Sequence, residues 1–122
     1  MVSFRQMMKG DYYGVSASLK KIKDPEKLAA SQKSYFHFIK GGIAAHSSDW
    51  SESELQFQQA LNIGLRTKND THIAMYRLAQ AFSKQGRKEE ALVLLEQMYE
   101  EKLNPEIQVE VEKLLHEYKS NI

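Results

Sequence analysis

The sequence predicts an all-α protein, an antiparallel helical-hairpin solenoid of about three hairpins followed by a capping helix. Three observations support this fold class. Both prolines stand where a helix is expected to begin, no segment shows the period-two alternation of a strand, and the predicted turns recur at a fixed interval. We expect residues 1–122 to form a single domain.

Local signals set the helix boundaries. In "DPE" at 24–26 and "NPE" at 104–106, an N-cap residue precedes a proline in the first helical position and a glutamate in the first turn. Further breaks are expected near Gly10, at 47–49, at 69–71 and at Gly86. The predicted helices cover about 2–9, 11–23, 25–46, 50–66, 71–85, 87–102 and 105–120. The short connections predict that neighbouring helices lie antiparallel.

The turns and the helices that follow them repeat with a period of 38 residues. The period relates Gly10 to Ser48 to Gly86, Tyr12 to Trp50, Val15 to Ser53 to Ala91, Leu19 to Phe57 to Leu95, and Ile22 to Ala60 to Met98. Small or apolar residues at matching positions are typical of stacked hairpins. Trp50 is therefore interpreted as part of the scaffold.

The repeats are assigned to about 1–24, 25–68 and 70–103, with the capping helix at 105–120. An apolar stripe on the last helix is expected to seal the stack, and charged residues are expected to cover its other faces. The stripe consists of Ile107, Val111, Leu114 and Tyr118.

Composition argues against several classes of partner. The 17 Lys and Arg residues nearly cancel the 16 Asp and Glu residues, so the chain lacks the strong positive field that attracts nucleic acid or an anionic membrane. Cysteine is absent, which suits a reducing cytoplasm, and no stretch approaches the ~18 apolar residues of a membrane span. We expect a cytoplasmic protein that binds neither nucleic acid nor membrane.

The sequence also lacks the patterns of a metal or catalytic site. His37, His46, His72 and His116 include no i, i+4 pair, and we expect His46 and His72 at the surface. A G-x-S-x-G motif and a glycine-rich phosphate loop are both missing, and Gly41-Gly42 lies inside a helical pattern, where it favours close helix packing. We expect no enzymatic activity, no cofactor and no metal.

The segment "MYRLAQAFSKQGRKEEALVLLEQM", residues 75–98, resembles a tetratricopeptide repeat. The matching positions are Leu78, Ala79, Phe82, Gly86, Ala91, Leu95 and Met98. The resemblance implies a helical repeat whose first helices line a concave groove and whose role is protein–protein interaction. The repeat is longer than the usual ~34 residues.

Residues 35–60 more particularly resemble repeats of the Rap and PlcR group of peptide-sensing bacterial regulators. The resemblance rests on Tyr35, Phe36, Phe38, Lys40, Gly41 and Trp50. It implies a peptide-responsive regulator.

A candidate peptide-binding groove lies on the first helix of the 70–103 repeat. Arg77, Gln80 and Lys84 have i, i+3, i+7 spacing and share one face, next to Tyr76. With Phe38 from the preceding repeat, they would form a basic, partly aromatic floor for an acidic or C-terminal peptide. The alternative is an ordinary solvated helix face.

A second candidate interface lies at the N-terminal end, where Phe4, Met7 and Met8 have no preceding helix to cover them. They would suit a homodimer or an assembly contact, unless further repeats precede Met1 in a longer protein. The main hypothesis is a non-enzymatic peptide- or protein-binding adaptor. The alternatives are the sensor part of a Rap- or PlcR-like regulator and a self-associating assembly factor.

Overall fold

The computed structural model describes residues 29–120, which form five α-helices. They are α3 (Ala30–His46), α4 (Trp50–Ile63), α5 (Lys68–Lys84), α6 (Lys88–Tyr99) and α7 (Pro105–Ser120). No strand occurs in this range, so the all-α prediction is confirmed there. The helices expected at 2–9 and 11–23, and the N-terminal interface of Phe4, Met7 and Met8, lie outside the described residues.

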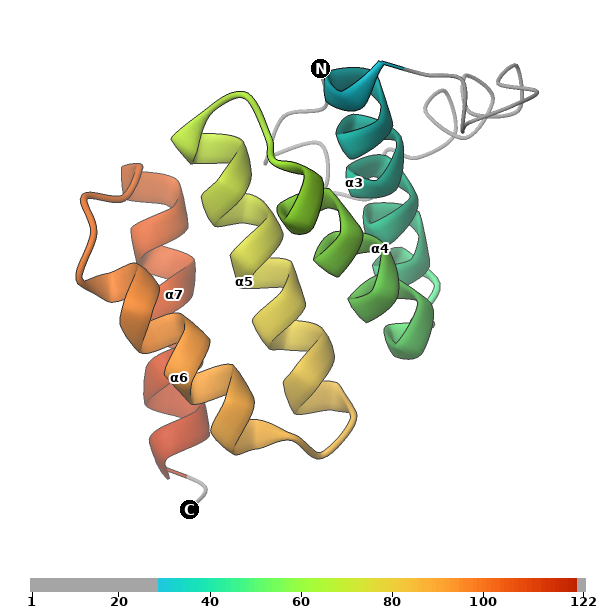
Figure 1. The fold of residues 1–122 in the computed structure, drawn as a ribbon. Helices are drawn as coiled ribbons and strands as arrows, with labels where there is room; N and C mark the ends of the chain where they lie inside the picture. Colours follow the sequence, from blue (N-terminus) through green and yellow to red (C-terminus); the bar gives the residue numbers. More distant parts are fainter. Residues whose placement is uncertain (1–28, 121–122) are drawn as a thin grey trace.

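The helices pack as two hairpins and a last helix (Figure 1). Helix α3 pairs with α4, α5 pairs with α6, and α4 packs against α5 to join the two hairpins. Helix α7 contacts both α6 and α5, and α3 also touches α5. Alternate helices α3, α5 and α7 are therefore neighbours, with α4 and α6 packed against them. None of the described helices combines the length and apolar character that a membrane span requires.

The helix boundaries show which sequence signals act as caps. Asn104 Oδ1 accepts a hydrogen bond from the Glu106 amide at 2.9 Å, and α7 begins at Pro105, as predicted. The break predicted at 69–71 is wrong, since α5 already begins at Lys68. Thr67 is its N-cap and accepts from the Asp70 amide at 3.0 Å. The polar residues at 69–71 occupy the first turn of α5 instead.

The predicted 38-residue register agrees with the backbone and with the core of the described hairpins. Ser48 and Gly86 both have positive φ, 60° and 82°, in the turns that precede α4 and α6. Residues of α4 and α6 that lie 38 positions apart form three pairs, and both members of each pair are 0% exposed. These pairs are Ser53 with Ala91, Phe57 with Leu95, and Ala60 with Met98.

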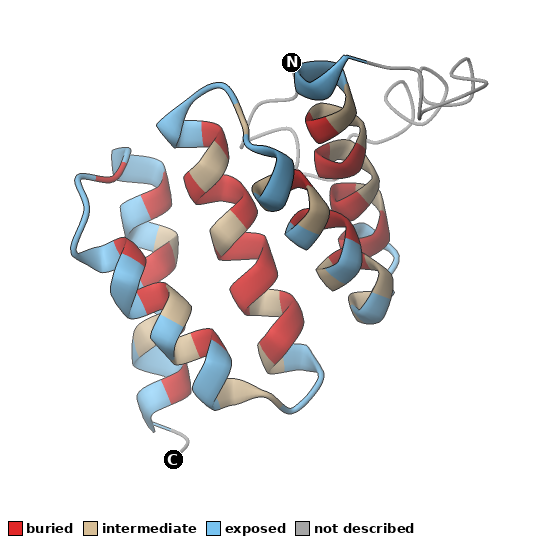
Figure 2. Cartoon of the chain, in the orientation of Figure 1, coloured by how far each residue is buried: buried red, intermediate tan, exposed pale blue. Residues whose placement is uncertain are grey.

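The core continues into α5 and α7. Figure 2 shows buried residues along most of α5, which has neighbours on both sides, whereas α7 is buried along one stripe. That stripe is the predicted one, and its members are no more than 9% exposed: Ile107, Val111, Leu114 and Tyr118. The charged residues Glu106, Glu112, Lys113 and Glu117 are exposed around it.

Gly41 allows α3 and α4 to approach closely, as the sequence predicted for this glycine. A Cβ atom added at Gly41 would lie 2.8 Å from Cδ2 of the Phe57 ring. The ring itself is fully buried and stands edge-on to Phe38, with ring centroids 5.8 Å apart. A side chain at Gly41 would therefore compete directly with the core of the first described hairpin.

Polar contacts tie the two hairpins together at both ends. The Glu54 carboxylate on α4 accepts from Arg87 Nη1 at 2.7 Å and from Gln85 Nε2 at 2.8 Å. The Arg87 guanidinium also lies 4.5 Å from the centroid of the Phe82 ring. At the other end, the Tyr35 hydroxyl donates to Asp70 Oδ2 at 2.5 Å. These contacts fix the angle at which α5 packs against the α3–α4 hairpin.

Ser53 provides a test of the repeat register. Its hydroxyl is completely buried and has no hydrogen-bond partner among the described residues, while the equivalent position in the next hairpin is Ala91. Because an unsatisfied buried hydroxyl costs about 1–3 kcal/mol, Ser53→Ala should leave the free energy of unfolding unchanged or raise it by up to about 1 kcal/mol. Urea denaturation followed by circular dichroism measures this change. A loss above about 1 kcal/mol would show that the hydroxyl contributes a contact to the fold.

Candidate binding groove

A groove of about 350 Å³ lies between α5 and α7, near the start of α6. Helix α5 contributes Gln80, Ser83 and Lys84, and these three share one helix face because they follow i, i+3, i+4 spacing. The remaining lining residues are Lys88 of α6 and Leu114, Glu117 and Tyr118 of α7. The groove thus combines two ammonium groups, one carboxylate, an aromatic ring and an apolar contact.

Aromatic rings lie close to both lysines of the groove. Lys88 Nζ lies 5.9 Å from the centroid of the Tyr118 ring, and Lys84 Nζ lies 5.9 Å from that of Trp50. Such cation–π contacts hold an ammonium group over a ring face without neutralising its charge. Trp50 is the first residue of α4, and its ring lies beside the Lys84 ammonium without lining the groove itself.

Two tyrosine hydroxyls near the groove titrate above their usual range. Burial raises the pKa of Tyr118, and hydrogen bonding with Ser83 partly opposes this rise. Burial is also the main cause of the strongly raised pKa of Tyr76, and the negative charge of Glu110 on α7 raises it further. Both phenols are therefore protonated at neutral pH.

The structure brings only part of the sequence-predicted floor to the surface. Gln80 and Lys84 line the groove, whereas Phe38 is 0% and Tyr76 2% exposed, so both rings belong to the core. Arg77 is 7% exposed, and its Nη1 donates to Gln80 Oε1 at 2.8 Å. Phe38, Tyr76 and Arg77 therefore do not line the α5–α7 groove. The buried Arg77 instead orients the Gln80 amide through this hydrogen bond.

Sequence reasoning missed the groove residues Ser83, Lys88, Leu114, Glu117 and Tyr118. Part of the signal was present, because the 38-residue step that relates Phe38 to Tyr76 continues to Leu114, and the same step relates Gln80 to Tyr118. Leu114 and Tyr118 were assigned only to the capping stripe. They belong to that stripe and also form the α7 wall of the groove.

The histidines do not converge on a site. His37 Nδ1 lies 2.7 Å from Gln56 Oε1, and His72 Nε2 lies 3.3 Å from Glu101 Oε1. The surface position expected for His72 is wrong, since α5 begins at Lys68 and places His72, 3% exposed, inside the stack. His46 is exposed, as expected. Within residues 29–120, no group of three or more histidine or carboxylate side chains is arranged to hold a metal ion.

Comparison with known protein families, with curated proteins and with solved structures finds no match to this chain. A function is therefore inferred from the geometry of the α5–α7 groove.

Proposed function

We propose that the chain is a non-enzymatic binding module of tetratricopeptide type, an adaptor that holds an acidic segment of a protein or peptide partner. The observation that carries the proposal is the α5–α7 groove, whose lining combines Lys84 and Lys88 with the ring of Tyr118 and the apolar side chain of Leu114. Support for a tetratricopeptide-type solenoid comes from the shared register of the two hairpins, in turn conformation and in burial.

The proposed mechanism is presentation by a rigid scaffold. The two lysines attract a carboxylate, and the protonated Tyr118 and the Gln80 amide offer hydrogen bonds to the peptide. Gln80 is already oriented by its bond from Arg77, and Tyr118 is held by burial, so little side-chain entropy is lost on binding. Glu117 at the rim would disfavour a segment with acidic residues along its whole length. It therefore favours a single carboxylate, such as a C-terminus, beside an apolar residue.

Charge reversal in the groove tests this function. Peptides selected from a random phage-displayed library with the whole chain as bait should be enriched in carboxylates beside apolar residues. Their affinity, measured by fluorescence anisotropy, should fall about tenfold or more in Lys84→Glu/Lys88→Glu, because each lost attraction is replaced by repulsion.

The matched control is Lys68→Glu/Lys102→Glu, which makes the same change in net charge at two exposed lysines outside the groove. It should bind the selected peptides like the unaltered chain. Thermal melts verify that all variants are folded. Selection of peptides without acidic enrichment, or equal affinities for the two double variants, would contradict the proposal. Arg77→Glu is unsuitable here because a buried charge reversal would destabilise the fold.

A further inference from the structure

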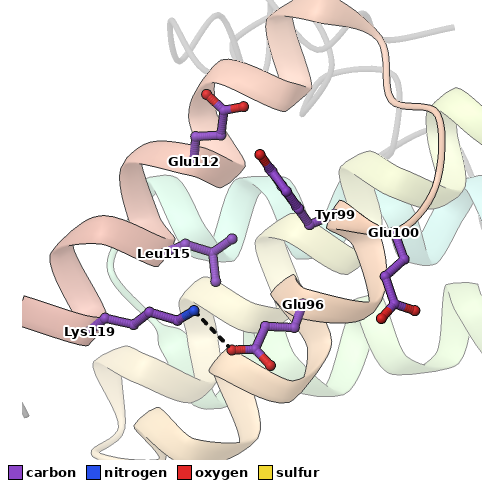
Figure 3. Close-up of a pocket in the computed structure, with 6 residues that line it drawn as sticks. All are labelled: Glu96, Tyr99, Glu100, Glu112, Leu115 and Lys119. Atoms are coloured by element: carbon purple, nitrogen blue, oxygen red, sulfur yellow. Dashed lines mark ion pairs between the residues drawn. The ribbon is translucent and has the colours of Figure 1, made fainter.

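A second groove, of about 430 Å³, lies between α6 and α7 on a different face of α7 (Figure 3). Its lining comes from Glu96, Tyr99 and Glu100 on the α6 side and from Glu112, Leu115 and Lys119 on α7. None of these residues lines the α5–α7 groove. The proposal below is therefore independent of the acidic-peptide function.

The α6–α7 groove has an apolar centre with polar ends. Figure 3 shows Tyr99 and Leu115 directed into the space between the helices, with Glu112 at one end and the Lys119–Glu96 ion pair at the other. Tyr99 is 52% exposed, and Leu115 is partly buried. The exposed ring and the leucine offer a partner an apolar surface.

The charge of this groove is negative. Lys119 Nζ lies 3.3 Å from Glu96 Oε1, so that pair is locally neutral, while Glu100 and Glu112 have no cationic partner among the described residues. Helix α6 ends at Tyr99 with Glu100 as its C-cap, and the carbonyl groups at a helix C-terminus add partial negative charge. A cation placed near Tyr99 would therefore lie close to the negative end of the α6 dipole, in a groove whose lining includes the carboxylates of Glu100 and Glu112.

We propose that the α6–α7 groove binds a basic segment of a protein partner, one with arginine or lysine next to an apolar side chain. The arginine would stack on the exposed Tyr99 ring and pair with Glu100 or Glu112, and the apolar neighbour would cover Leu115. An acidic segment would be repelled. A purely apolar segment would bury the carboxylates without a counter-charge, which is unfavourable. The two sides of α7 thus recognise segments of opposite charge.

The test uses a fluorescein-labelled helical peptide of leucine and arginine, titrated into the whole chain and followed by anisotropy. A control peptide carries glutamate in place of every arginine. We expect the Leu–Arg peptide to bind and the Leu–Glu peptide not to bind. Glu100→Lys/Glu112→Lys should weaken binding about tenfold or more, and Tyr99→Ala should weaken it about threefold or more.

The control variant is Glu89→Lys, an exposed glutamate at the opposite end of α6, which should bind the Leu–Arg peptide within about twofold of the unaltered chain. Lysine at position 100 suits the helix C-terminus, so loss of folding is not expected, and circular dichroism checks this. Absent binding, equal affinity in all variants, or equal binding of the Leu–Glu peptide would overturn the proposal. So would sedimentation that shows a dimer dissolved by Glu100→Lys, because the occupant would then be a second copy of the chain.

Discussion

Replacing Phe38 with alanine should lower the free energy of unfolding by about 3–5 kcal/mol. The ring is completely buried and stands edge-on to two other rings, with centroid distances of 5.9 Å to Tyr35 and 5.8 Å to Phe57. Its removal would leave a cavity at the junction of α3 and α4, where close packing prevents collapse. Urea denaturation with circular dichroism gives the change, and the circular dichroism spectrum before denaturation shows whether the helices are retained.

The neighbouring Phe36 supplies the matched control. It has the same ring on the same helix but is only partly buried, and Lys40 Nζ lies 5.3 Å from its centroid. Phe36→Ala should therefore cost clearly less than Phe38→Ala, about 1–2 kcal/mol. Similar costs for both substitutions would mean that Phe38 is as accessible as Phe36. That result would support the sequence-based prediction that Phe38 is exposed in a peptide-binding floor.

The register could be predicted from the sequence because it depends on residues whose local chemistry is nearly independent of context. A turn that needs positive φ selects glycine or a small polar residue, and Ser48 and Gly86 satisfy that need one period apart. Proline at a first helical position and a small residue at a helix contact are similarly local signals, as Pro105 and Ala91 show. Such features allowed the order of the helices and much of the core to be predicted.

The groove could be predicted only in part, because helical spacing identifies a face without identifying what covers it. Arg77, Gln80 and Lys84 do share a face of α5, yet Arg77 lies beneath Gln80 while Lys84 reaches the surface. Phe38 and Tyr76 occupy equivalent register positions and are both core residues, since each is covered by a neighbouring helix. Burial of this kind depends on which helix packs on that face. The spacing of residues within one helix does not identify that neighbour.

The first residue of α5 was also mispredicted because it depends on contacts with another helix. The residues at 69–71 are polar and favour turns, but Thr67 can cap the helix upstream, and Asp70 then becomes both a first-turn carboxylate and the acceptor for Tyr35. Two competing N-cap signals within a few residues differ by only about 1 kcal/mol. A contact with another hairpin is enough to select between them.

Gly41→Ala should lower the free energy of unfolding by about 1–3 kcal/mol, even though alanine has the higher helix propensity by roughly 1 kcal/mol. The new methyl group would lie 2.8 Å from Cδ2 of Phe57, and that ring is fixed by its contact with Phe38. Urea denaturation measures the loss. In the second hairpin, Ala79 is equivalent to Gly41 and Leu95 to Phe57, and both are fully buried. A methyl group therefore fits at this position when the facing residue is leucine.

The double variant Gly41→Ala/Phe57→Leu therefore copies the second hairpin into the first. Phe57→Leu alone should cost about 1–1.5 kcal/mol through lost ring contacts. Together the two substitutions should destabilise less than the sum of their separate effects, by about 1 kcal/mol or more, because the leucine vacates the space that the alanine methyl requires. Strictly additive losses would mean that Gly41 and Phe57 do not share one packing site, and the structural equivalence of the two hairpins would then fail at their closest contact.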